Sequence, residues 1–167
     1  MITTDRLILR PWKRADLQSL DAILGDPKVM RFSDNGPLTC ADQRNWLDNA
    51  ISSAGIPGYI AIERRTDCQV IGYVSLLNNP KRNASHELEL GFRLVWAVWS
   101  QGYATEAAMG LLKGDAVNSG QKRIIAIVDP NNHTSVRVLE KLGMRFEKKR
   151  MFRGYDYPDH QYVLPID

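Results

Sequence analysis

The stretch WSQGYATEA, residues 99–107, decides how the rest of the sequence is interpreted. It follows a segment rich in Leu, Val and Trp, and it leads into residues that share one stripe of a helix: Ala104, Ala107, Ala108, Leu111, Leu112 and Ala116. The stretch therefore predicts a strand, a turn at Gly102 and the start of a helix. Because glycine has no Cβ, the backbone at this turn is free to adopt unusual angles and to approach a ligand closely.

The start of this helix is a candidate anion site. Its first N–H groups lack partners inside the helix and lie at the positive end of the helix dipole, and residues 99–105, which form the turn, include no acidic residue. We therefore expect the turn to bind phosphate. Neither GxGxxG nor GxxxxGK followed by Ser or Thr occurs, which argues against the common dinucleotide and nucleoside-triphosphate sites. A tight turn without a ligand is the alternative interpretation of Gly102.

The preceding segment HELELGFRLVW, residues 86–96, predicts a strand with two different faces. Alternation places Leu88, Leu90, Phe92 and Leu94 on one face, and Glu87, Glu89, Gly91 and Arg93 on the other. In a sheet that helices cover on both sides, a polar row indicates a cleft. A solvated face is the alternative.

Apolar periodicity divides the whole chain into short alternating elements. It predicts strands at 6–12, 58–65, 69–77, 86–96, 121–128, 144–152 and 160–166, and helices at 16–24, 41–54, 104–116 and 133–142. Thr39 is the expected N-cap of the second helix, and Gly143 the expected left-handed cap of the last. The order β-α-α-β-β-β-α-β-α-β-β is typical of a mixed α/β fold, a sheet with helices on its faces.

Length, composition and charge limit the function classes. The 167 residues, 44% of them apolar, indicate one globular domain spanning 1–167. No apolar run is long enough to span a membrane, and Cys40 and Cys68 show no paired spacing, so we expect a cytoplasmic protein without disulfides. The three histidines, His86, His133 and His160, show no metal-ligand spacing, so no metal site is predicted.

The third of the chain from 121 to 153 is strongly basic, with nine Lys and Arg residues against three acidic ones. Such a segment favours a polyanionic partner: a nucleic acid, a ribosomal surface or a phosphorylated cofactor. A solvated strand and helix face is the bland alternative.

Four segments in this order resemble the GNAT superfamily of acyl-CoA-dependent N-acyltransferases. They are TDRLILRPWKRADL with DPKVMRF, ELGF with WSQGYATEA, DPNNHTSVRVLEKLGM, and the closing DHQYVL. The branch that the chain most resembles is that of the ribosomal-protein N-terminal acetyltransferases, which act on alanine or serine. The resemblance implies a GNAT-like fold: a central, mostly antiparallel sheet of six to seven strands, splayed at the cofactor site, with about four helices on its faces.

The resemblance also implies acetyl-CoA as co-substrate. Backbone N–H groups of the turn hold its pyrophosphate, the preceding strand pairs with its pantetheine arm, and Trp99 takes the place where the family usually has Gln or Arg. Asn132 matches an asparagine that contacts the pantetheine region, and Arg137 and Lys141 are candidates for the phosphates. The complete set implied for the cofactor is Leu90, Gly91, Phe92, Trp99, Ser100, Gln101, Gly102, Tyr103, Ala104, Thr105, Asn132, Ser135, Arg137 and Lys141.

Catalysis requires a neutral amine, and a carboxylate near the end of the strand is suited to remove its proton. Glu87 and Glu89 both fit, and the resemblance favours Glu89, with Glu87 helping to bind a cationic substrate. Many family members use a tyrosine to protonate the departing thiolate, but this chain has Leu139 at that position. Ser135, one turn earlier, and the tyrosines of RGYDYPDHQY are the candidates that remain.

The acceptor is left open by the sequence. Protein N-termini, as in the resembled branch, compete with polyamines, amino acids and antibiotic-like amines, and the loops around MRFSDNGPLT and FRGYDYPDH are expected to choose among them. A non-catalytic acyl-CoA sensor, or a module that docks on RNA or the ribosome, is the competing function class. Binding that weakens with salt would favour the latter. We expect no membrane partner, and a homodimer is the default assembly.

Overall fold

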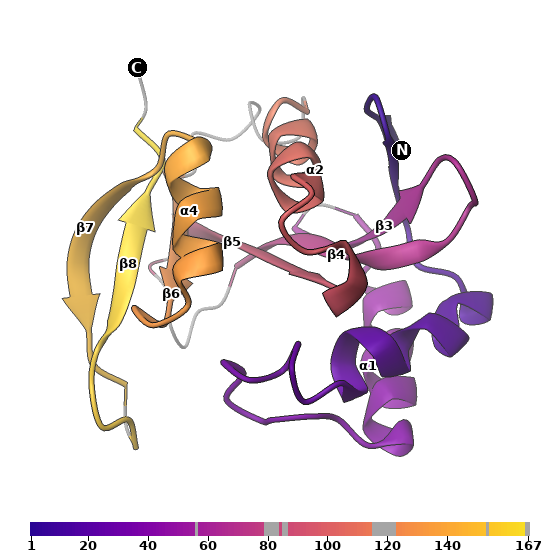
Figure 1. The fold of residues 1–167 in the computed structure, drawn as a ribbon, viewed down its shortest axis with the longest axis horizontal. Helices are drawn as coiled ribbons and strands as arrows, with labels where there is room; N and C mark the ends of the chain where they lie inside the picture. The colour runs from indigo at the N-terminus through magenta and orange to yellow at the C-terminus, as the bar shows by residue number, and fades with distance from the viewer. Residues whose placement is uncertain (56, 79–83, 85–86, 115–122, 153, 166–167) are drawn as a thin grey trace.

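The centre of the protein is one eight-stranded sheet. The computed structural model describes residues 1–55, 57–78, 84, 87–114, 123–152 and 154–165 (Figure 1). The strands, in chain order, are β1 (Ile2–Thr3), β2 (Leu7–Arg10), β3 (Gly58–Arg64), β4 (Val70–Leu77), β5 (Glu87–Leu94), β6 (Arg123–Val128), β7 (Arg145–Arg150) and β8 (Asp159–Val163). They lie in the order β1-β2-β3-β4-β5-β6-β8-β7. All neighbours are antiparallel except β5 and β6, which are parallel.

The expected mixed fold with a mostly antiparallel sheet is confirmed. The eighth strand, β1, was not predicted, because two residues are too few to show a period. His86 and Ala116, and Lys122 and Arg153 of the basic segment 121–153, lie outside the described residues.

Helices cover both faces of the sheet (Figure 1). On one face lie α2 (Tyr103–Leu112) and α4 (His133–Lys141), and on the other lies α1 (Cys40–Ser52), together with the helical segments η1 (Arg14–Ser19) and η2 (Asp21–Gly25). A single 3-10 turn, η3 (Trp96–Val98), joins β5 to α2. No helix in the described part of the chain is long and apolar enough to cross a membrane.

Two hydrophobic clusters fill the space between the sheet and these helices. Beneath α2 and α4, the apolar face of β5 contributes Leu88, Leu90 and Leu94, and Phe92 packs against the same cluster. This confirms the predicted division of the strand into an apolar and a polar face. The second cluster joins α1, η1 and η2 to the other face of β3 and β4.

The predicted helix over 16–24 is helical but is not an α-helix. A 3-10 segment, η1, is followed by a π-helical segment, η2. Asp16 is drawn inward, because its carboxylate accepts from Nη1 of Arg10 at 2.8 Å and from the N–H of Lys13 at 2.8 Å. Arg10 also donates to Glu63 at 2.6 Å. This buried ion-pair group fixes a tight first turn that propensity alone does not indicate.

The N-cap predicted at Thr39 is confirmed, and it provides a test of local stability. Its Oγ1 accepts from the N–H of Asp42 at 3.2 Å, and the Asp42 carboxylate accepts from the Thr39 N–H at 3.3 Å. Thr39→Ala is expected to lower the free energy of unfolding by about 1 kcal/mol, because one N–H at the start of α1 loses its partner. Urea unfolding measures the loss. Thr39→Ser keeps the hydroxyl, so equal losses in both variants would contradict this role.

Candidate functional site

Within the described residues, strands β5 and β6 run side by side for three residue pairs and then part. The register joins Glu87 to Arg123, Leu88 to Ile124 and Glu89 to Ile125. Beyond these pairs, β5 continues against β4, whereas β6 continues against β8. The sheet is therefore splayed in its middle, as the resemblance implies.

Backbone groups of β5 point into this gap. Val95 donates its N–H to the carbonyl oxygen of Ile71 at 2.9 Å. Because donors alternate in direction along a strand, the N–H groups of Phe92 and Leu94 turn away from β4, toward the side that β6 leaves open. The carbonyl oxygen of Leu94 accepts from Nε1 of Trp99 at 2.8 Å. The gap is thus bordered by backbone donors and acceptors that a bound molecule can use.

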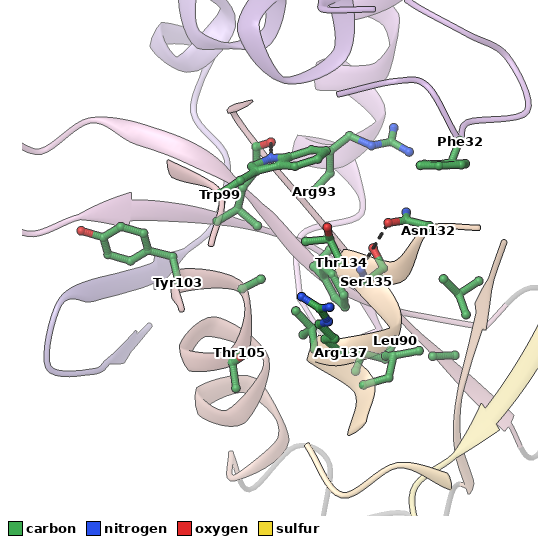
Figure 2. A pocket seen from close by; sticks show the side chains of 18 of the residues that line it. Phe32, Leu90, Arg93, Trp99, Tyr103, Thr105, Asn132, Thr134, Ser135 and Arg137 are labelled. Carbon is green, nitrogen blue, oxygen red and sulfur yellow. Dashed lines mark hydrogen bonds between the residues drawn. The ribbon is translucent and has the colours of Figure 1, made fainter. Parts of the chain in front are cut away.

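A first cavity, of about 510 Å³, lies between β5, the turn before α2 and α4. It brings together most of the predicted site residues: Glu89, Leu90, Gly91, Phe92, Trp99, Ser100, Gly102, Tyr103, Ala104, Thr105, Asn132, Ser135, Arg137 and Lys141. Gln101 is not among the lining residues, and its carbonyl oxygen accepts from Arg6 at 3.0 Å. Figure 2 shows Trp99 and Tyr103 on one side of this cavity, and Asn132, Thr134, Ser135 and Arg137 on the other.

The turn before α2 has the backbone conformation that its glycine predicts. Gly102 has a φ of 83° at the N-cap position, and no side chain caps the helix. Ser100 has a φ of 61°, which is uncommon for a residue other than glycine and costs free energy. The first hydrogen bond of α2 joins the N–H of Glu106 to the carbonyl oxygen of Gly102 at 3.0 Å. The N–H groups before it have no partner inside the helix and suit an anion.

Glu106 fastens this turn to the N-terminal strands. Its carboxylate accepts from Oγ1 of Thr4 at 2.6 Å, and from the N–H and Nε of Arg6 at 2.8 and 2.6 Å. The guanidinium of Arg6 also lies over the Tyr103 ring, 4.2 Å from its centroid. Burial acts to raise the pKa of Glu106, but the hydrogen bonds from Thr4 and Arg6 lower it overall.

Glu106→Gln is expected to destabilise the protein by about 1 kcal/mol near neutral pH, because hydrogen bonds to a charged but half-exposed partner are weakened. The folded-state pKa of Glu106 is lowered, so its contribution is complete above the unfolded-state pKa of about 4.3 and is lost as pH falls through the folded-state value. The difference between wild type and variant should therefore shrink in acid. Urea unfolding at about pH 7 and about pH 4 measures it. A difference that grows in acid would contradict the assignment.

Helix α4 supplies the opposite wall. Oδ1 of Asn132 accepts from the N–H of Ser135 at 3.2 Å, which caps the helix and fixes Ser135 beside the cavity (Figure 2). Leu139 is buried and lines the same cavity, so an aliphatic side chain stands where the resemblance implies a tyrosine. Gly143 has a φ of 80°, which confirms the predicted left-handed cap.

A second cavity, of about 630 Å³, adjoins the first on the side of the sheet that α1 covers. Its borders include residues 30–35 and 154–157, from the two loops that sequence analysis proposed for acceptor selection. Glu89, Gly91 and Arg93, on the polar face of β5, line both cavities. Glu89 therefore lies at their junction.

Two tyrosines of the C-terminal loop border the second cavity through contacts with carboxylates. Tyr157 donates to Oδ2 of Asp129 at 2.7 Å, and Tyr155 donates to Asp34. The hydrogen bond to Asp129 raises the pKa of Tyr157, which keeps this phenol protonated. Tyr162, the third tyrosine of this segment, is buried and lines neither cavity.

The structure does not bring Glu87 into either cavity. Its buried carboxylate accepts from Nη1 of Arg123 at 2.8 Å and from the N–H of Ala84 at 3.1 Å. Alternation along β5 places both glutamates on one face, but it does not show that β6 covers the start of the strand and leaves its end open. Glu87 is thus engaged in an ion pair with Arg123, and its contact with a cationic substrate stays a prediction.

Sequence reasoning missed several lining residues. Phe32 lies in a loop, and Tyr73 lies on β4, where the pairing register places it beside Arg93. Arg93 carried a signal, because alternation put it on the face of Glu89, but that signal suggested no role. Thr134 of α4 and Asp129 at the end of β6 also line the first cavity. Within the described residues, no group of three or more His, Cys, Asp or Glu side chains is arranged to hold a metal ion.

Comparison with known proteins gives consistent findings. The family model for the acetyltransferase (GNAT) domain matches residues 6–145. YnaD of Bacillus subtilis (strain 168), named as an uncharacterized N-acetyltransferase, is 31% identical over 99% of this chain and 96% of its own length. FsC-acetyl coenzyme A-N(2)-transacetylase of Aspergillus fumigatus is 27% identical over 80% of this chain and 59% of its own length.

Solved structures show the same architecture. An acetyltransferase of the GNAT family from Bacillus anthracis has a TM-score of 0.84 and 26% identity, and the match covers 97% of this chain and 96% of that one. An acetyl transferase from Salmonella typhimurium, which modifies the N-terminal serine of 50S ribosomal subunit protein L7/L12, has a TM-score of 0.80 and 18% identity. That match covers 98% of this chain and 97% of the other, and it shows a shared fold.

Proposed function

This chain belongs to the GNAT acetyltransferase family, and from that premise we propose that it transfers the acetyl group of acetyl-CoA to a primary amine, by direct attack in a ternary complex. The observation that carries the proposal is the position of Glu89, which lines both adjoining cavities. A donor in the first cavity and an amine in the second would meet beside this carboxylate. We also propose that residues 1–167 form one acyltransferase domain, because all eight strands belong to one sheet.

The lining of the first cavity supports acetyl-CoA as its ligand. The left-handed backbone at Ser100 and Gly102 presents the start of α2 to the phosphates, and Arg137 and Lys141 add positive charge to the same cavity. The open side of β5 offers backbone groups to the pantetheine arm. When bound, acetyl-CoA supplies the activated acetyl group as a thioester.

Glu89 prepares the amine. An ammonium has no lone pair for attack, so Glu89 accepts its proton, directly or through a water molecule. A backbone N–H between Leu90 and Phe92 polarises the thioester carbonyl, because the N–H of Phe92 is directed toward the gap. These two groups come from neighbouring positions of one rigid strand, which holds them in a fixed relation.

Ser135 donates a proton to the departing thiolate. Its hydroxyl lies on the wall of the first cavity, one turn before Leu139. Tyr155 and Tyr157 border the second cavity and already donate to carboxylates, so Ser135 is the better placed donor, directly or through water.

Two acceptor classes have support. The Salmonella typhimurium neighbour modifies a protein N-terminus, which favours an N-terminal amine, whereas the Aspergillus fumigatus relative is named as an N(2)-transacetylase, which favours a smaller molecule. Docking on a polyanion has less support, because Arg123 already pairs with Glu87 and Glu147 inside the protein. The exposed strand β7 still presents Lys148 and Lys149 at the edge of the sheet.

The test is an acetyl-transfer screen read by mass spectrometry. Purified protein and acetyl-CoA are offered N-terminal peptides of varied first residues beside a set of polyamines, amino acids and other small amines. Acetylated peptides would support an N-terminal acetyltransferase, and acetylated small amines alone would support the second class. Binding of acetyl-CoA without acetylation of any amine would overturn the transferase and support a non-catalytic sensor.

A further inference from the structure

We propose that Arg93 is a specificity-determining residue that binds a carboxylate of the acceptor, so that the preferred acceptor carries a carboxylate as well as its reactive amine. The inference rests on the transfer activity proposed above and adds a substrate class to it. It starts from a single arginine that lines both cavities.

Arg93 lies on the same face of β5 as Glu89, four residues further along the strand. At the rise of an extended strand, their Cα atoms are separated by about 13 Å. Figure 2 shows the side chain of Arg93 extending toward Phe32, on the other side of the cavity from Arg137. An acceptor whose amine lies at Glu89, and which extends through the second cavity along β5, would pass the guanidinium.

The guanidinium of Arg93 lacks the partner that such a group usually has. Among the described residues, its hydrogen bond is to Sδ of Met30, at 3.0 Å, its guanidinium lies 6.0 Å from the centroid of the Tyr73 ring, and no ion pair includes it. A thioether sulfur is a weak acceptor, and most of the N–H donors of an arginine are left over. Arg10, by contrast, donates to the carboxylates of Asp16 and Glu63. A partly buried arginine with so little pairing, on the wall of a cavity, is suited to bind an anion from outside.

The surrounding charges show which kind of anion fits. The carboxylates that line the second cavity outnumber its two arginines: they belong to Asp34, Glu89, Asp129, Asp156 and Asp159. A molecule that is only anionic would be repelled, whereas a molecule that carries both an amine and a carboxylate would meet charges of both signs in this cavity. Arg31, the other arginine, stacks over Phe32, 5.2 Å from the ring centroid.

The carboxylate has two chemical sources, and the experiment separates them. It is either the α-carboxylate of a free amino acid or the side chain of an acidic residue close to a protein N-terminus. Steady-state kinetics compare amino acids with their amides, and peptides bearing Asp or Glu at the second or third position with their Asn or Gln counterparts. If the acid form has the lower KM among the amino acids, the carboxylate is the α-carboxylate of a free amino acid. If it has the lower KM among the peptides, the carboxylate is an acidic side chain near a protein N-terminus.

Arg93→Met, Arg93→Lys and the control Arg31→Met are tested with the same pairs. We expect the wild type to prefer the acid form by roughly tenfold in KM, the value of one charge-assisted contact. Arg93→Met should abolish this ratio. Arg93→Lys, which keeps the charge but loses the planar fork, should retain part of it. Arg31→Met should retain the ratio, because Arg31 lines only the second cavity, whereas Arg93 lines both and lies on the same strand face as Glu89.

Several results would overturn the inference. Equal KM values for acid and amide forms in the wild type would overturn it and leave the transferase intact. Loss of acetyl-CoA affinity in Arg93→Met, measured by calorimetry, would assign Arg93 to the donor instead. Equal loss of the ratio in Arg31→Met would indicate a general charge effect. If the wild type bound acetyl-CoA but acetylated no amine, the proposed function would fail and this inference with it. If Arg93→Met does not fold, the KM ratio of Arg93→Lys is compared with that of the wild type instead.

Discussion

Glu89→Gln is expected to lower kcat roughly 100- to 1000-fold at neutral pH, the usual contribution of a positioned general base. Glutamine has nearly the same shape, so both cavities keep their form while the proton acceptor is lost. Because the uncatalysed route depends on amine that is already neutral, the residual rate should rise with pH as that fraction grows. The measurement is kcat as a function of pH, with a saturating acceptor from the screen and saturating acetyl-CoA.

Glu87→Gln is the matched control, two residues away on the same strand. Glu87 lies outside both cavities and pairs with Arg123, so the expected effect is a lower melting temperature with much less change in kcat. Acetyl-CoA affinity should be the same in both variants, as calorimetry would show. Full turnover by Glu89→Gln at neutral pH would remove Glu89 as the base, and an equal loss of kcat in Glu87→Gln would point to a general effect on the strand.

Gly102→Asp is expected to weaken acetyl-CoA binding roughly 100-fold relative to Gly102→Asn, because a carboxylate at the start of α2 would repel the phosphates. Aspartate and asparagine have similar size and tolerate the left-handed region better than most residues, so the backbone cost at a φ of 83° is shared by the two. A Cβ at this position would lie 3.4 Å from Nη2 of Arg6, a contact that a flexible side chain accommodates. The comparison therefore isolates the charge.

Calorimetry at low and high salt measures this difference, which should shrink as salt screens the charges. The melting temperature provides an independent check, because a negative charge at a helix N-terminus stabilises the fold while it is expected to weaken binding of the phosphates. Gly102→Asp should therefore melt no lower than Gly102→Asn while binding less. Equal affinities of the two variants at low salt would show that the phosphates lie elsewhere.

Much of the fold follows from local sequence signals. The N-cap at Thr39, the left-handed glycines at 102 and 143 and the two faces of β5 depend on neighbouring residues, and the structure confirms each of them. The nature of the segment before residue 25 was not predictable, because the tight turn at Asp16 depends on Arg10 and on Glu63, from strand β3. Nor does periodicity indicate that β8 inserts between β6 and β7, since the pairing partner of a strand is not encoded in its own alternation.

The candidate site divides in the same way. The turn at 99–105 and the start of α4 were predicted, because each is a continuous segment whose residue types imply a backbone shape. Glu87 was grouped with Glu89 because they share a face, yet it lies outside both cavities, since the pairing of β6 with the start of the strand is a property of the assembled sheet. The sequence suggested no role for Arg93. Its importance lies in having no carboxylate partner among the described residues, and side-chain partners are visible only in the folded structure.

The parting of β5 from β6 has a consequence for how the molecule comes apart. Within the described residues, three rungs of the sheet join the unit built from β6, β7 and β8 to the rest, so that seam contributes few backbone hydrogen bonds there. The apolar cluster beneath α2 and α4 contains residues from both sides of it, among them Leu88 of β5 and Ile124 of β6. Amide hydrogen exchange should therefore proceed through a partial opening that frees the C-terminal hairpin while β2, β3 and β4 stay paired. A ligand that contacts both sides of the seam would stabilise the closed state and slow amide exchange on both sides of it.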